Sequence, residues 1–231
     1  MASQLLVALL ITASFAALAY ALGMVSRGGA LGGLVVGTTV YASLGPQGFA
    51  ILALFVVGGS LLTRLGYRSK QRAGTAQELG GRRGAKNAFA NCAVAVLCAA
   101  LASLTGAPSF TASFAAALGA AFADTAESEV GQIYGRTPRL ITTLRKVPPG
   151  TDGAVSLPGT LAGIAAATVT AALCLALGLL GDPGTMLLVA LAAFLGTVAD
   201  SLIGASYPRI GNEATNLFCT LVAAVLALPF T

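Results

Sequence analysis

Apolar runs of membrane-spanning length recur from one end of this chain to the other, and they constrain its fold more than any other feature. Hydrophobic residues occupy 56% of the 231 positions, whereas charged residues occupy only 9%. A bilayer's hydrocarbon core, about 30 Å thick, needs roughly 20 apolar residues per helical span. We therefore predict an all-α, polytopic transmembrane helix bundle.

We expect about 7–8 spans within a single integral-membrane domain, residues 1–231. A β-barrel is excluded because its strands would alternate apolar and polar residues, whereas residues 173–180 are apolar on every side. The candidate spans are approximately 4–23, 30–44, 47–63, 88–105, 110–127, 158–180, 184–204 and 214–230.

The positive charges predict how the chain is oriented. Lys and Arg concentrate in loops that stay in the cytoplasm during insertion. Eight spans put all thirteen on one face, mostly in a basic loop at about 64–87 and a second loop at about 124–157. We expect a bacterial inner or thylakoid-type membrane with this face cytoplasmic. The basic face has two alternative explanations. One is ordinary positive-inside patterning, and the other is a surface that attracts anionic lipid headgroups or nucleotide.

Three of the eight acidic residues lie together in the segment 123–129, at the end of an apolar run. On a helix, Asp124, Glu127 and Ser128 stand at i, i+3 and i+4, so their oxygens are predicted to converge on one hard cation. Glu129 points elsewhere by the same periodicity. The alternative is that these acids only neutralise nearby Arg residues.

Both long loops carry groups suited to phosphate. Glycines flank Arg82 and Arg83, so the backbone can approach a phosphate that two guanidiniums grip, although a solvated basic loop has the same composition. The second loop offers exposed amides at Gly150-Thr151-Asp152-Gly153, just before a helix. It also carries cations suited to a polyphosphate. These are Arg136, Arg139, Arg145 and Lys146.

A short echo and two Asn pairs add polar groups near the same face. The sequence 118–125 is echoed by 195–201, which ends in Asp200 and Ser201. An acid inside a span indicates a functional site by default. Paired amides lie at the starts of two spans, where they either tie helices together or contact ligand. They are Asn87 with Asn91, and Asn212 with Asn216.

Other residue types exclude some chemistry. The chain contains no His, which rules out His-based nucleophiles and His-ligated metals. Its four cysteines lack the spacing of a zinc or redox site and are interpreted as small core residues. They are Cys92, Cys98, Cys174 and Cys219.

Three separated motifs, in order, carry a resemblance to a known family. They are DTAESEVG at 124–131, PRLITT at 138–143 and VPPGTDGAVS at 147–156, supported by segments 81–91, 198–205 and 212–217. The chain resembles the integral-membrane phytyl-phosphate kinase family, the group that includes transmembrane protein 19. It is more distantly similar to CTP-dependent phytol and dolichol kinases. The similarity covers nearly the whole chain.

The resemblance implies a Mg²⁺-dependent kinase that transfers the γ-phosphate of CTP to a prenyl monophosphate. Phytyl phosphate is the leading acceptor, for phytol salvage into tocopherol or phylloquinone. The expected partners are CTP or another nucleoside triphosphate, a prenyl monophosphate and membrane lipids, with no nucleic acid and with a homodimer left open. The missing His is no obstacle, because a phosphate monoester is already a dianion near neutral pH.

The resemblance also implies roles for individual residues. The predicted Mg²⁺ ligands are Asp124, Glu127 and Asp200, which with Lys146 form the predicted catalytic set. The predicted substrate and nucleotide contacts are Arg82, Arg83, Asn87, Asn91, Thr125, Ser128, Arg136, Thr142, Gly150, Thr151, Asp152, Gly153, Ser156, Ser201, Asn212 and Asn216.

Two other functions fit the same sequence. A membrane cytidylyltransferase would use the same CTP, Mg²⁺ and lipid phosphate but release pyrophosphate. An ion-coupled secondary transporter would explain the intramembrane acids and the echo, but a carrier has little use for two long basic loops.

Overall fold

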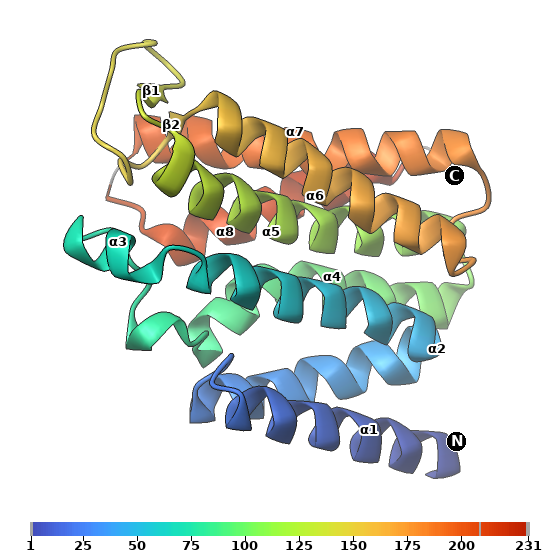
Figure 1. Ribbon diagram of the computed structural model, residues 1–231. Helices are drawn as coiled ribbons and strands as arrows, with labels where there is room; N and C mark the ends of the chain where they lie inside the picture. Colours follow the sequence, from blue (N-terminus) through green and yellow to red (C-terminus); the bar gives the residue numbers. More distant parts are fainter. Residues whose placement is uncertain (1, 208, 230–231) are drawn as a thin grey trace.

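Long helices lie side by side and cross the molecule in alternating directions, as a computed structural model shows for residues 2–207 and 209–229 (Figure 1). The long helices are α1 (Ala2–Ala21), α2 (Arg27–Arg64), α4 (Ala85–Thr105), α5 (Pro108–Tyr134), α6 (Leu157–Ala176), α7 (Pro183–Ser206) and α8 (Asn212–Ala227). The short elements are α3 (Tyr67–Arg72), the 3-10 helix η1 (Leu79–Gly81), β1 (Arg139–Leu140) and β2 (Ala154–Val155).

Helix α2 consists of two antiparallel arms that meet at Gly45 and Pro46. Gly45 has φ +66°, a left-handed conformation that glycine adopts without strain. Pro46 follows and lacks the backbone N–H that would continue the hydrogen-bond ladder. The chain therefore reverses direction here, and the two arms run back along each other in Figure 1.

Each of the eight predicted runs contains a helix or an arm of one, which confirms the predicted all-α bundle. Among the described residues, five helices are long and apolar enough to cross a membrane, namely α1, α2, α4, α6 and α7. Helix α8 is shorter, at 16 residues. Helix α5 is also absent from this group. Its sequence is less apolar because it lies at the centre of the bundle.

Helix α5 is the centre of the bundle and contacts α2, α4, α6, α7 and α8. Every residue from Ala112 to Ala123 is buried. A helix that other helices surround needs small side chains for close approach more than it needs strongly apolar ones. The Ala- and Gly-rich sequence of α5 supplies them.

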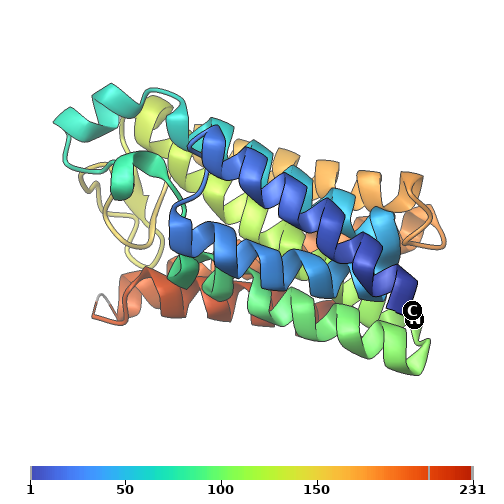
Figure 2. The same cartoon turned by 90° about the horizontal axis from the view of Figure 1, so that it is seen from below.

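Both long loops lie at one end of the bundle, together with the α1–α2 and α7–α8 connections (Figure 2). All thirteen Lys and Arg residues belong to these connections or to the helix turns beside them. We call this end the basic end. Its predicted cytoplasmic orientation remains a prediction.

Candidate active site

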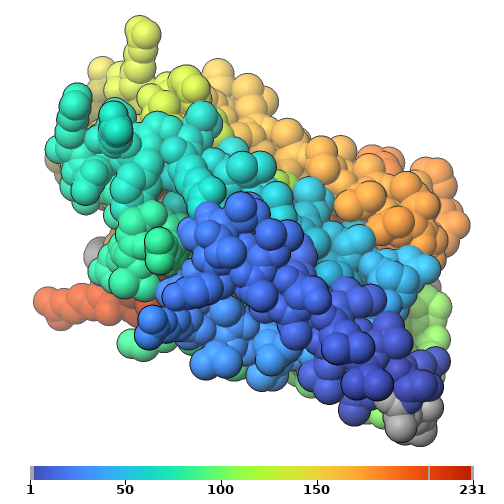
Figure 3. Space-filling view, turned by 60° about the horizontal axis from the view of Figure 1, so that its bottom comes forward, coloured from blue at the N-terminus to red at the C-terminus, as the bar shows by residue number. Residues whose placement is uncertain are grey.

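A cavity of about 790 Å³ opens at the basic end, between the ends of the central helices and the two long loops. Figure 3 shows the surface hollowed between the 65–84 segment and the α7–α8 connection. Polar side chains from α4, α5, α7 and α8 line it, as do both loops. Residues distant in the sequence therefore line one open cavity at the basic end.

Seven acidic residues line this cavity, and the three predicted metal ligands are among them: Asp124 and Glu127 from α5 and Asp200 from α7. Glu127 Oε1 accepts a hydrogen bond from Thr160 Oγ1 at 3.1 Å. Asp200 Oδ1 is buried without a hydrogen-bond partner. The carboxylates that the echo suggested as a pair thus belong to one site, and one of them has an unused buried oxygen.

Small residues bring the two acidic helices together. A Cβ added to Gly119 of α5 would lie 3.1 Å from Ala193 Cβ, and one added to Gly196 of α7 would lie 3.2 Å from Ala120 Cβ. The two helices therefore approach closely through reciprocal Gly–Ala contacts, five and four residues before Asp124 and Asp200.

The three carboxylates predicted to bind one metal ion do not form a complete ligand set in the structure. No group of three or more Asp, Glu, Cys or His side chains in the described part of the chain is close enough to hold a metal ion. Mg²⁺ in nucleotide sites is usually held by one or two carboxylates, with substrate phosphates and waters as its remaining ligands. The arrangement of Asp124 and Asp200 suits that kind of site.

Arg83 supplies a half-buried positive charge to the cavity. Its Nη1 donates to Asn87 Oδ1 and its Nη2 to Thr125 Oγ1, both at 3.1 Å, and its guanidinium lies 5.0 Å from the centre of the Phe55 ring. Its Nε is buried and unpartnered. Burial lowers the pKa of the Arg83 guanidinium, and the charge of Glu129 partly offsets this effect. A half-buried cation with a spare N–H is suited to an anionic oxygen.

The backbone of Arg83 is fixed by the α1–α2 connection. Its N–H donates to Met24 O at 3.1 Å, and Ser26 N–H donates to its carbonyl at 3.0 Å. A Cβ on Gly29 would lie 2.1 Å from that carbonyl oxygen. Glycine at position 29 therefore allows the first turn of α2 to pack directly on the Arg83 backbone.

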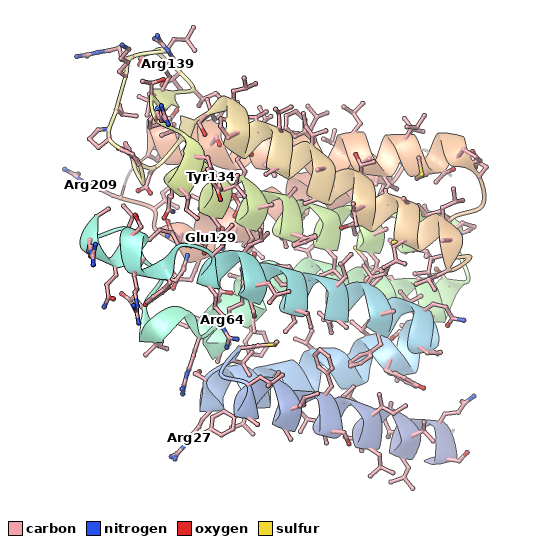
Figure 4. The ribbon with its side chains drawn as sticks, viewed as in Figure 1. Arg27, Arg64, Glu129, Tyr134, Arg139 and Arg209 are labelled. Carbon is pink, nitrogen blue, oxygen red and sulfur yellow. The ribbon has the colours of Figure 1, made fainter. Side chains whose placement is uncertain are left out.

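Lys70 attaches the first loop to the central helix. This side chain is 2% exposed, and its Nζ forms an ion pair with Glu129 Oε2 on α5 and donates to Thr63 O at 2.8 Å. Figure 4 shows Glu129 next to α3 at the basic end. The helical periodicity predicted that Glu129 faces away from Asp124, but it did not identify Lys70 as its partner.

Gly153 allows the second loop to pack closely against α7. Its φ is +72°, and an added Cβ would lie 2.4 Å from Ala205 N and 2.5 Å from Ser201 O. The neighbouring Ser156 caps α6, with its Oγ accepting from Gly159 N at 3.3 Å. The loop therefore approaches both helices through close backbone contacts.

We expect Gly153→Ala to lower the apparent melting temperature in detergent more than Gly178→Ala does. Both glycines have nearly the same positive φ, +72° and +74°, so both variants incur left-handed strain of roughly 1–2 kcal/mol. Only at Gly153 does the new methyl group also overlap another helix, since nothing lies within 4 Å of the Gly178 site. Equal melting temperatures would show that the loop does not pack here.

Most predicted contacts line the cavity, whereas four predicted site residues do not. Asn91 is buried in α4 and donates to Asn87 O at 2.9 Å, so it supports Asn87 instead of facing the cavity. Arg136, Thr142 and Lys146 are exposed on a hairpin outside the cavity. The predicted residues that line the cavity are Arg82, Arg83, Asn87, Asp124, Thr125, Glu127, Ser128, Gly150, Thr151, Asp152, Gly153, Ser156, Asp200, Ser201, Asn212 and Asn216.

The structure adds residues that the sequence analysis did not select. Gln132 and Tyr207 also line the cavity, and Gln132 Oε1 is buried without a partner. Gln132 lies one helical turn beyond Ser128, so the i+4 spacing used for the acidic segment, extended by one turn, would have identified it.

Comparison with known proteins places this architecture in a family. The family model described as integral membrane protein DUF92 matches residues 10–224. An uncharacterized membrane protein of Synechocystis is 38% identical, over 84% of this chain and 78% of that one. Protein VTE6, chloroplastic, of Arabidopsis thaliana is 31% identical, over 88% of this chain and 64% of that one. An uncharacterized membrane protein of Methanocaldococcus jannaschii is 32% identical, over 87% and 83%.

No solved structure matches the chain. The match to the family model and the extended similarity to these relatives agree with the resemblance that the sequence motifs carried. The chain therefore belongs to the integral membrane protein family DUF92.

Proposed function

We propose that this protein is a Mg²⁺-dependent prenyl-phosphate kinase that transfers the γ-phosphate of CTP to phytyl phosphate. The observation that supports it most is the cavity at the basic end, where Asp124 and Asp200 face the same space as the half-buried Arg83. Carboxylates and a guanidinium in one cavity provide what a metal-bound nucleotide and a lipid phosphate need. The motifs shared with phytyl-phosphate kinases and the similarity to protein VTE6 agree with it.

The residues present fit a magnesium ion. Asp200 has a buried oxygen with no partner, and Asp124 lines the same cavity from α5. A bound Mg²⁺ would neutralise charge on the phosphates as the γ-phosphoryl group transfers. Asp124 and Asp200 would hold it, and Glu127 would contribute through a carboxylate that Thr160 already orients.

In this reaction the side chains and backbone amides of the protein would bind and orient the phosphates. An oxygen of the lipid phosphate forms a bond to the γ-phosphorus while the bond to the β-phosphate oxygen breaks and CDP leaves. The attacking group is already a dianion, so no side chain has to remove a proton. Arg83 would donate its free Nε–H to a phosphate oxygen, and Gly150–Gly153 would offer backbone amides to the nucleotide.

The test is to follow CTP labelled at the γ-phosphate, with phytyl phosphate and protein in lipid nanodiscs. A kinase puts the label on the lipid, as phytyl diphosphate. A cytidylyltransferase puts it on pyrophosphate, and a transporter leaves CTP intact. Label in pyrophosphate, or no consumption of CTP, would therefore overturn the proposal.

Arg83→Lys separates charge from geometry at this site. The variant keeps a cation but loses the two guanidinium hydrogen bonds to Asn87 and Thr125. We therefore expect the KM of the substrate whose phosphate Arg83 binds to rise about tenfold. Steady-state kinetics in nanodiscs measure this. Arg68→Lys on α3, exposed and outside the cavity, is the matched control and should leave KM unchanged. An unchanged KM in Arg83→Lys would exclude Arg83 from phosphate binding.

A further inference from the structure

A small basic hairpin projects from the second loop, and its four cations do not line the cavity, although its Pro138 does. We define the basic hairpin as residues 136–147. Leu140 N donates to Arg145 O at 2.9 Å, Val147 N donates to Pro138 O at 3.1 Å, and Arg139 Nη1 donates to Leu144 O at 2.6 Å. These bonds close the turn. In addition, β1 pairs with β2, which directly precedes α6 in the sequence. The hairpin is thus a fixed structure with its own hydrogen bonds.

Its charges are all positive and all exposed. Arg136, Arg139, Arg145 and Lys146 are exposed, and none of them lines the cavity. Lys70–Glu129 is the one ion pair among the described residues, so no carboxylate neutralises the hairpin. Four uncompensated cations within twelve residues form a surface for anions.

The hairpin lies at the rim of the bundle. Figure 4 shows Arg139 at the basic end, beyond the ends of the helices and directed away from the bundle. The outer faces of the neighbouring α6 and α7 carry exposed apolar side chains, including Leu157, Leu161 and Leu187, as lipid-facing helices do. In a bilayer that covers these apolar faces, the hairpin would lie at the level of the lipid headgroups.

Its tip has a large apolar side chain. Leu144 is 63% exposed and has φ +57°, a conformation that a branched residue seldom adopts. An apolar side chain between basic residues is the pattern of segments that rest in the interface of an anionic membrane.

From these contacts and charges we propose that the basic hairpin docks onto anionic lipid headgroups of the membrane in which the protein is embedded. The headgroup phosphates would contact the four cations, and Leu144 would enter the interface beside them. Each basic residue near an anionic surface strengthens such docking about fivefold. This inference does not depend on the proposed kinase activity.

The test places an environment-sensitive dye on the hairpin. Leu144→Cys can be labelled selectively because all four native cysteines are buried. The labelled protein is reconstituted in nanodiscs of phosphatidylcholine alone or with phosphatidylglycerol added. We expect blue-shifted, stronger emission in the anionic discs and reversal at high salt.

Matched charge variants show whether the hairpin itself responds. Arg145→Gln/Lys146→Gln should lower the ratio of docked to undocked hairpin about thirtyfold. Arg68→Gln/Arg72→Gln removes the same charge from α3 and should leave the response intact. Equal emission in neutral and anionic discs, or a response that survives Arg145→Gln/Lys146→Gln, would overturn the proposal. A response to Mg²⁺ and CTP in neutral discs would instead assign the hairpin to the nucleotide site and overturn it as well.

Discussion

Asp124→Asn is expected to lower the rate of phosphate transfer by a factor on the order of 10² to 10³, while the protein still inserts and folds. The substitution keeps the shape of the side chain but removes the negative charge that would help to hold Mg²⁺. The charge stabilisation that a metal provides in phosphoryl transfer amounts to several kcal/mol, which corresponds to at least two orders of magnitude in rate. Turnover of labelled CTP in nanodiscs measures the effect.

Asp182→Asn is the matched control for this change. Asp182 lies at the opposite end of the bundle, where its Oδ1 accepts from Gly184 N at 2.8 Å and Thr185 N at 3.1 Å as the cap of α7. Asn caps helices about as well as Asp, so this variant should be active and stable. A wild-type rate for Asp124→Asn, with size-exclusion profiles alike, would exclude a metal role for Asp124.

The second large effect concerns stability. Lys70→Met is expected to lower the free energy of unfolding by about 3–5 kcal/mol, because it leaves the buried Glu129 carboxylate without its partner. Chemical unfolding in mixed micelles measures this change. Lys70→Met/Glu129→Leu should recover much of the loss, because it removes both buried charges together.

Arg72→Met, an exposed position on the same short helix, should change stability by less than about 0.5 kcal/mol. The two Lys70 variants together also test the geometry. If Lys70→Met were as stable as the parent, or if the double variant were less stable than Lys70→Met, the ion pair would not hold α3 against α5.

The helices were predictable because they depend on local composition. The break at Gly45 and Pro46 was visible as two residue types that end a helix, and the structure reverses α2 there. The echo around Asp124 and Asp200 was also a local signal, and both acids line one cavity. In the first case neighbouring residues contained the information, and in the second a repeated sequence pattern did.

Contacts between distant segments were not predictable in this way. Lys70 and Glu129 are 59 positions apart, and nothing near either residue identifies the other. Likewise, Arg136 and Lys146 have the charge expected of a phosphate site, but the loop folds with Arg139 paired to Val155, and neither cation lines the cavity. The direction in which a loop folds depends on long-range pairing that its own residues do not reveal.

The continuous burial of α5 has a consequence for the setting in which this protein can work. From Ala112 to Ala123 the helix that carries Asp124 touches only protein, so the surrounding helices, and not α5, meet the lipid tails. Changes in bilayer thickness or lipid type would then deform the outer helices first and leave the carboxylates in place. Such insulation would let this architecture operate in membranes that differ in thickness and lipid composition.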